Sequence, residues 1–301
     1  MRYRPFGMSG AAISNLTLSF GLDSLARGRE AALHLLYSAL EAGVNAYRLE
    51  TADPVAAEVL GEALAHVDRK LVCVGLTLGL GAGREAERDF SAEGMTGAID
   101  RALHFSGLGW IDVAVLHEPG EHELPQSSLN ALKALRATGR IKLLGVAGGD
   151  EVMDTYVSTG AFDVLLTPFD INADWRLRNR IRAAREQDMA VFAYDYFTDR
   201  RAKARGAEAA PKKGLFGFGG AKHPTRSGKN DAFGFLYRTP NWAAEAICLS
   251  YVLTDPTISS VIVRANDVDR LNMLAATPER DLPPGLAAQI EMGRVTASAA
   301  A

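Results

Sequence analysis

The sequence is poor in several features that would assign it to a specialised class of protein. Only Cys73 and Cys248 are cysteines, and no Cys-x-x-Cys or Cys/His spacing accompanies them. We therefore predict neither a disulfide framework nor a metal site. The net charge of −3 shows no cationic excess, which argues against nucleic acid as a partner. No apolar stretch is long enough for a signal peptide or a transmembrane segment, so we expect a cytoplasmic protein.

What the chain does contain is a regular alternation of short apolar segments and amphipathic helical segments. Its 301 residues, 48% of them hydrophobic, fit one large domain. The predicted strands are 15–20, 44–49, 70–78, 111–117, 140–148, 162–168, 189–195 and 258–264. The predicted helices are 30–43, 56–67, 92–107, 125–139, 150–159, 174–188, 241–255 and 267–276.

This rhythm of strand and helix predicts a single (β/α)8 TIM barrel over residues 1–301. An open, doubly wound sheet is the alternative, and the lack of a Gly-x-Gly-x-x-Gly segment after the first strand argues against it. In a barrel the chemistry lies on the loops after the carboxyl ends of the strands. Those ends carry Glu50–Asp53, Leu76–Leu78, His117–Glu118, Ala147–Gly149, Asp170, Asp195 and Arg264–Asn266.

A series of landmarks resembles the aldo-keto reductase family. In chain order they are "YRPFGMSGAAIS", "EAGVNAYRLETAD", "EVLGEAL", "IDVAVLHEP", "GRIKLLGVA", "VFAYD" and "SVIV". The resemblance implies a barrel that transfers a hydride from a nicotinamide cofactor to a carbonyl. It also implies a Tyr as proton donor, a Lys paired with an Asp that lowers the pKa of this Tyr, and a His that orients the carbonyl.

The catalytic positions that the resemblance implies are largely substituted. The Asp position falls on Glu50 and the His position on His117, so these two are the candidate catalytic residues. Val55 stands where the Tyr is expected, and Leu76 stands where the Lys is expected. Valine has no proton to donate, and leucine cannot stabilise an oxyanion. The residues around the two positions contain no tyrosine and no lysine, respectively.

The expected contacts with NADP(H) are changed as well. The Ser-Asn pair that holds the nicotinamide becomes Ala147 and a glycine, and the phosphate loop after the seventh strand carries Asp195. A carboxylate there opposes a pyrophosphate. Tyr194 remains as a ring for the nicotinamide, and Arg264 and Asn266 remain as candidate cofactor contacts. We therefore predict that NADP(H) binds weakly or not at all.

A basic, glycine-rich insertion is predicted at about 196–235, after the seventh strand. It holds nine Lys or Arg residues from Arg200 to Lys229, against the single acid Glu208. Loops of this length are usually functional or disordered. We interpret the insertion as an arm that binds an acidic protein or an anionic surface. An insert without a binding role and a lid over the barrel mouth are the alternatives.

The leading hypothesis is a divergent family member that has lost ordinary carbonyl reductase activity. It would act as a binding or regulatory protein, with an unknown small molecule at the barrel mouth. The first alternative is an NAD(P)H-dependent oxidoreductase that uses His117 or Glu50 as the proton source. The second is a non-redox barrel enzyme in which Glu50 and His117 form an acid–base pair. The residues alone leave these three functions open.

Overall fold

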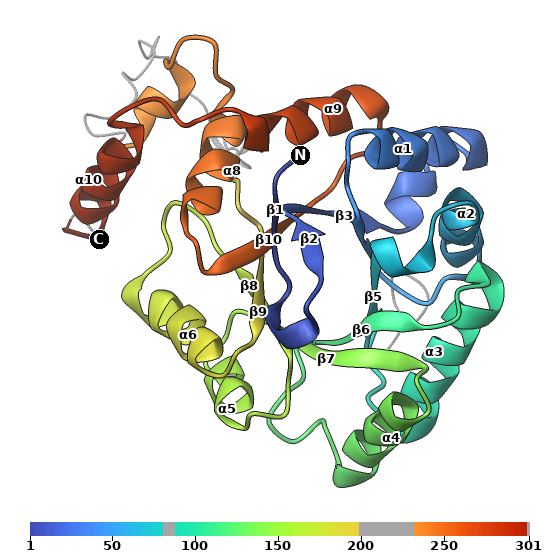
Figure 1. Cartoon of the computed structure of the whole chain (residues 1–301). Coiled ribbons are helices and arrows are strands. Elements are labelled where there is room, and N and C mark those ends of the chain that lie inside the picture. Colours follow the sequence, from blue (N-terminus) through green and yellow to red (C-terminus); the bar gives the residue numbers. More distant parts are fainter. Residues whose placement is uncertain (81–87, 199–231, 300–301) are drawn as a thin grey trace, which may run out of the picture.

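The computed structural model describes residues 1–80, 88–198 and 232–299, which form a closed barrel of parallel strands surrounded by helices (Figure 1). Neighbouring strands follow chain order around the barrel, and the last strand returns to the first. The strands are β3 (Leu16–Phe20), β4 (Ala46–Leu49), β5 (Cys73–Leu78), β6 (Ile111–His117), β7 (Ile141–Ala147), β8 (Val164–Pro168), β9 (Ala190–Tyr194) and β10 (Ile258–Val263). The predicted (β/α)8 TIM barrel is confirmed, and the open sheet is excluded because these strands close into a ring.

The barrel closes at a seam between β10 and β3. The two strands run parallel, with Val261 opposite Leu16. The hydroxyl groups of Thr17 and Ser260, which are 243 residues apart in the chain, lie 2.7 Å apart and form a hydrogen bond. The seam therefore joins the first and the last strand of the barrel through backbone pairing and through side chains.

Side chains alternate between the two faces of each strand, and this alternation decides which residues face the inside of the barrel. On β4, Tyr47 belongs to the core that includes the helices, whereas Ala46 belongs to the cluster inside the barrel. Arg48 shares the inward face with Ala46. On β5, Leu76 belongs to the helix-side core, and the next residue, Thr77, faces Arg48 inside the barrel.

Eight of the described helices follow strands of the barrel, and four of these begin with a side-chain cap. Their bounds are α1 (Arg29–Glu41), α2 (Pro54–Leu64), α3 (Ala92–Ser106), α4 (Gln126–Ala137), α5 (Val152–Ser158), α6 (Trp175–Glu186), α8 (Ala244–Thr254) and α9 (Val268–Ala276). In α2, α3, α6 and α9 the cap side chain accepts a hydrogen bond from a backbone N–H of the first turn, and these caps are Asp53, Ser91, Asp174 and Asp267. Such caps satisfy donors that a helix otherwise leaves free, and they fix the loops at the strand ends.

Helices α2 and α3 approach each other closely at Gly61. A Cβ atom at this position would overlap the carbonyl group of Ser106, the last residue of α3. Gly97 lies on the same helix α3, and a Cβ atom there would meet nothing within 4 Å. Only the first glycine is therefore required by packing.

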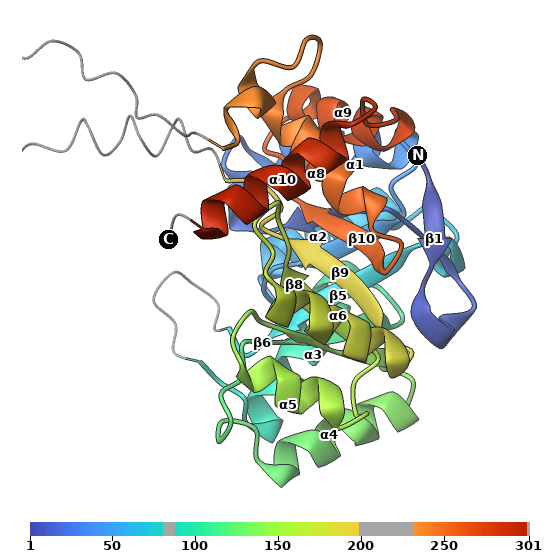
Figure 2. The same ribbon diagram turned by 90° about the vertical axis from the view of Figure 1, so that its left-hand side faces the viewer.

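Two elements that the sequence analysis did not predict complete the fold (Figure 2). The antiparallel hairpin of β1 (Tyr3–Pro5) and β2 (Ala12–Ser14) places Phe6 in the inner cluster, where its ring centroid lies 5.7 Å from that of Phe192. The helix α10 (Leu286–Ala299) is held by Glu291, which accepts hydrogen bonds from Arg178 and Tyr251. The hairpin covers the amino-terminal end of the barrel, and α10 packs outside it.

Most of the insertion predicted at 196–235 lies outside the described residues, because 199–231 are not placed. Its role as an arm for an acidic protein or an anionic surface stays a prediction. Within the described ranges, the helices are too short or too polar to cross a bilayer.

Candidate functional site at the barrel mouth

A cavity of ≈ 310 Å³ opens where the carboxyl ends of β4, β6, β9 and β10 meet. Barrel enzymes place their chemistry at this end, and the cavity lies near the lower limit of ligand pockets, which span ~300–1,000 Å³. Its polar and charged lining consists of Arg48, His117, Glu118, Tyr194, Asp195, Tyr196, Glu245, Arg264 and Arg270.

Arg48 forms the floor of this cavity. Its side chain also lines a second void of ≈ 20 Å³ beneath, whose other walls are mainly apolar. The Nε atom of Arg48 donates a hydrogen bond to Oγ1 of Thr77 at 2.9 Å. Burial lowers the pKa of Arg48, while the nearby Glu50 carboxylate acts in the opposite direction. Among the described residues, no carboxylate lies within ion-pair distance of the Arg48 guanidinium.

Glu50 connects the two sides of the seam of the barrel, because it binds Ser19 on β3 and Arg264, which follows β10. Its Oε1 atom accepts hydrogen bonds from Ser19 Oγ at 2.8 Å and from Arg264 Nε at 2.9 Å. Gly21 allows the Glu50 carboxylate to pack directly against the backbone, because a Cβ atom there would overlap it. Burial alone would raise the pKa of Glu50, but the hydrogen bonds from Ser19 and Arg264 outweigh it, so the pKa is lowered. Glu50 is therefore a carboxylate at neutral pH.

His117 lies at the end of β6 and lines the cavity. Its Nδ1 atom is buried and has no hydrogen-bond partner among the described residues. Burial lowers the pKa of His117, and Glu118 opposes the shift only in part. The imidazole is therefore neutral at pH 7. No hydrogen bond joins it to Glu50 within the described ranges, where the partners of Glu50 are Ser19 and Arg264.

Tyr194 is the inward residue at the end of β9, and it lines the same cavity as His117. Burial raises the pKa of Tyr194, and the carboxylates of Glu118 and Asp195 raise it further. The hydroxyl group is therefore a weaker acid than an exposed tyrosine. A proton donor for carbonyl reduction needs a pKa shifted in the opposite direction.

The two substituted positions, Val55 and Leu76, do not line the cavity. Val55 lies in the first turn of α2 with 49% of its surface exposed, and Leu76 is fully buried on the helix side of β5. The inward residue at this level of β5 is Thr77, which carries no charge. The cation at the floor of the cavity is instead Arg48, which the sequence analysis missed.

One corner of the cavity is closed by a network around Glu245 on α8. Both carboxylate oxygens of Glu245 accept hydrogen bonds from Arg270, at 2.7 and 3.0 Å. The hydroxyl group of Tyr196 donates a third bond at 2.7 Å. Arg264 is engaged with Glu50, and Asn266 is exposed and does not line the cavity. This corner follows β9 and β10, where the resemblance implies cofactor phosphates, and it presents a carboxylate.

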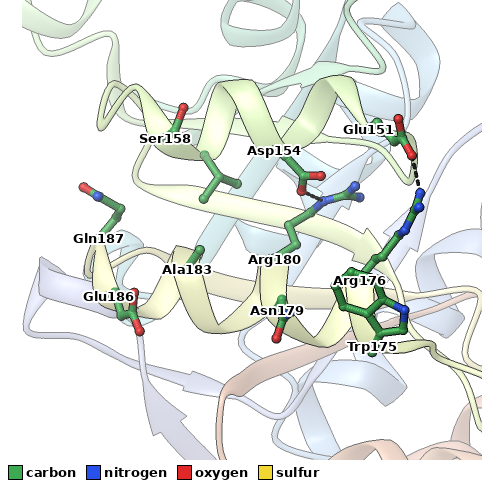
Figure 3. A pocket seen from close by; sticks show the side chains of 11 residues that line it. Glu151, Asp154, Ser158, Trp175, Arg176, Asn179, Arg180, Ala183, Glu186 and Gln187 are labelled. Carbon is green, nitrogen blue, oxygen red and sulfur yellow. Dashed lines mark hydrogen bonds and ion pairs between the residues drawn. The ribbon is translucent and has the colours of Figure 1, made fainter.

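A larger hollow of ≈ 550 Å³ lies outside the barrel, between α5 and α6 (Figure 3). Figure 3 shows two pairs of charged side chains that point toward one another: Asp154 binds Arg180, and Glu151 binds Arg176. These charges satisfy each other, and the hollow is lined by α5 and α6 rather than by the barrel strands. The barrel mouth is therefore the better candidate site. Within the described residues, no cluster of three or more His, Cys, Asp or Glu side chains is arranged to hold a metal.

Comparisons with known proteins agree with this architecture. The sequence model of the Aldo/keto reductase family matches residues 17–291. Among solved structures, the holo form of aldo-keto reductase AKR11C1 from Bacillus halodurans is similar with a TM-score of 0.73 and 20% identity, over 97% of this chain and 96% of that chain. Its apo form gives a TM-score of 0.69 and 18% identity, over 97% and 96%. At these identities the likeness to solved structures shows the fold alone. Comparison with curated proteins gives no match.

Proposed function

Because the chain belongs to the aldo/keto reductase family, we propose that it is a member without ordinary carbonyl reductase activity, which binds a small molecule at the barrel mouth. One observation carries the proposal. Among the described residues at the mouth, none combines a position in the cavity with a proton that is readily donated at neutral pH. The pKa of Tyr194 is raised, His117 is neutral, and Glu50 is ionised.

The contribution that a proton donor makes to the reaction rate supports the proposed loss of reductase activity. General acid catalysis by a positioned side chain contributes ~10²–10⁴-fold to the rate. Arg48 supplies a positive charge near the place where a carbonyl oxygen would develop negative charge, but its pKa remains too high for proton donation at pH 7. Charge stabilisation without a proton source leaves the product alkoxide unprotonated, so hydride transfer remains unfavourable.

Weak or absent binding of NADP(H) is part of the same proposal. The support is the pairing of Arg270 with Glu245, because both terminal nitrogens of this arginine are bound to the carboxylate and are not free for a phosphate. The charges of this pair offset each other, so the pair offers a phosphate no net attraction. Asp195 also lines the cavity, and its carboxylate repels a phosphate at 4 Å by ~1 kcal/mol in water-like surroundings and by ~4 kcal/mol at an effective dielectric constant of 20. The residues at this corner do not fit the phosphates of a dinucleotide.

A second candidate function is an NAD(P)H-dependent oxidoreductase with His117 as the proton source. Its support is the place of His117 in the cavity and the unpartnered Nδ1 atom. This chemistry requires the imidazolium form. Since the pKa of His117 is lowered from its ordinary value near 6.5, the activity would increase only as the pH falls below that ordinary value. An acid–base pair of Glu50 and His117 is less favoured, because no hydrogen bond joins the two side chains within the described residues and Glu50 is bound to Ser19 and Arg264.

The test is a titration of NADPH and NADH into the purified full-length chain, followed by a reduction assay with 4-nitrobenzaldehyde at pH 5.5 and pH 7. We expect no saturation in the low micromolar range and a turnover far below ~1 s⁻¹, a slow rate for an enzyme. A dissociation constant in the low micromolar range together with turnover near ~1 s⁻¹ at pH 7 overturns the proposal.

Two variants separate the remaining outcomes of this test. Activity confined to pH 5.5 and abolished by His117→Gln supports the second candidate. Tyr194→Phe removes only a hydroxyl group and is the matched control, because activity lost in this variant identifies Tyr194 as the donor. Loss in Tyr194→Phe would contradict the raised pKa that we assign to this residue.

A further inference from the structure

The floor of the mouth cavity carries a guanidinium group that lacks a carboxylate partner. Three arginines line the cavity, and two of them are neutralised: Arg264 binds Glu50, and Arg270 binds Glu245 with both of its terminal nitrogens. Arg48 is different. Only its Nε atom makes a hydrogen bond within the described residues, and the acceptor is the uncharged Thr77 hydroxyl.

Leaving the Arg48 guanidinium without a charged partner has an energetic cost. A buried charge is unfavourable unless it is paired and hydrogen-bonded, and native structures rarely leave one without partners. Glu50 lies on the same strand face, two residues along, yet its Oε1 atom is engaged by Ser19 and Arg264. Arg48 lines the cavity, and its terminal nitrogens make no hydrogen bond within the described residues, so a ligand in the cavity can bind them.

We propose that Arg48 binds the carboxylate group of a small organic acid that enters the barrel mouth. The inference rests on the proposed function, because it names the class of molecule that the mouth binds. A guanidinium group and a carboxylate are both planar and form two parallel hydrogen bonds, which give affinity and a fixed orientation. The bond to Thr77 fixes one edge of the guanidinium and leaves the other edge for the ligand.

The other residues that line the cavity further restrict the chemical class of the ligand. The carboxylates of Glu118 and Asp195 lie on the wall, and Asp195 adopts a left-handed backbone conformation with φ of 51°. These acids oppose a dianion such as phosphate, and they accept hydrogen bonds from a hydroxyl or ammonium group. The ligand class is therefore a small 2-hydroxy or 2-amino acid, with one carboxylate and at least one donor.

The experiment is calorimetric titration of the full-length chain with the sodium salts of glycolate and L-lactate, and with glycine, at matched ionic strength. Acetate, which lacks the donor, and inorganic phosphate are titrated in parallel. We expect at least one of the first three to bind more tightly than acetate, and we expect phosphate to bind less tightly than acetate. If none of the three binds up to ~10 mM, or if phosphate binds most tightly, the inference is wrong.

Variants test whether Arg48 makes the contact. Arg48→Met should lower the affinity by ~10–100-fold, the range for a hydrogen-bonded charged group. Arg27→Gln also removes one positive charge near the carboxyl ends of the strands, but Arg27 pairs with Asp267 and does not line the cavity. It is the matched control, for which we expect a change of less than ~3-fold. Equal losses in both variants would indicate attraction by the general field and would overturn the direct contact.

A second substitution keeps the test decisive if Arg48→Met fails to fold. Arg48→Lys retains the charge but loses the planar fork, so we expect ~10-fold weaker binding with little change in the melting temperature. Unchanged affinity in Arg48→Lys would contradict bidentate recognition. The outcome is separate from that of the proposed function: absent binding of these acids refutes the ligand class, whereas ordinary aldehyde reduction refutes the loss of reductase activity.

Discussion

Glu50→Gln tests how much Glu50 stabilises the barrel by connecting Ser19 and Arg264 across the seam. The substitution keeps the shape of the side chain and removes its charge. In the native chain the Glu50 carboxylate is 25% exposed and accepts hydrogen bonds from the buried Ser19 hydroxyl and from the Arg264 guanidinium. Glutamine retains an acceptor for Ser19 but loses the ion pair with Arg264.

The change in the free energy of unfolding expected for Glu50→Gln follows from these two contacts. Arg264 is 67% exposed, so its ion pair with Glu50 is screened by solvent and contributes ~0.5–1 kcal/mol. Replacing a charged acceptor by a neutral one weakens the bond from Ser19 by about 1 kcal/mol. The free energy of unfolding should therefore fall by ~1.5–2 kcal/mol at pH 7. For a chain of this size the melting temperature should fall by ~2–3 °C.

The pH dependence gives the same prediction an independent check. The pKa of Glu50 is lower in the folded chain than in the unfolded chain, where it is near 4.3. Its stabilisation is therefore complete above the unfolded-state pKa and is lost as the pH falls through the folded-state pKa. The difference between the native chain and Glu50→Gln should be largest at pH 7 and should shrink below pH ~4.

The assay is urea unfolding followed by tryptophan fluorescence at pH 7, 5 and 3.5. Glu151→Gln is the control, because the ion pair of Glu151 with Arg176 is exposed on both sides and should contribute nothing measurable. Equal stability of Glu50→Gln and the native chain at pH 7, or a difference that persists unchanged at pH 3.5, would refute the reasoning.

Two further predictions concern packing and proton linkage. Gly61→Ala should destabilise the chain by ~2 kcal/mol or more, because the new methyl group overlaps the Ser106 carbonyl. Gly97→Ala, on an open helix face, should be neutral or stabilising by ~0.5–1 kcal/mol. Urea unfolding of both variants measures these changes in stability. Binding of a carboxylate at Arg48 should raise the lowered pKa of the neighbouring His117, so binding takes up protons and becomes tighter as the pH falls from 7.5 to 5.5. Calorimetry in two buffers of different ionisation enthalpy should detect this proton uptake, and His117→Gln should abolish it.

The barrel could be predicted because its strands are local patterns. Residues 111–117 form an apolar run between turn residues, and the observed β6 has the same bounds. The hairpin β1–β2 and the helix α10 were missed for another reason. The β–α rhythm of a barrel does not require either element, and in α10 few side chains, such as Leu286 and Ile290, are buried.

The site was predicted only in part. Glu50 and His117 were found at strand ends, but their partners were not. Arg48 was visible in principle, since it lies near the end of β4 and two residues before Glu50, which predicts the same face for both. The pairing of Glu245 with Arg270 could not be read from spacing, because it joins two different helices, α8 and α9, and depends on their packing.

The seam between β10 and β3 has a consequence for synthesis on the ribosome. β10 is the only strand of the described barrel that pairs with both β3 and β9. A nascent chain that has emerged only as far as α8 therefore carries two open strand edges, which can pair with other chains. Because the Thr17–Ser260 contact spans 243 residues, closure must wait until nearly the whole chain has left the exit tunnel. We expect chains stalled before β10 to aggregate or to be held by chaperones, and chains that extend through α9 to become resistant to protease in one step.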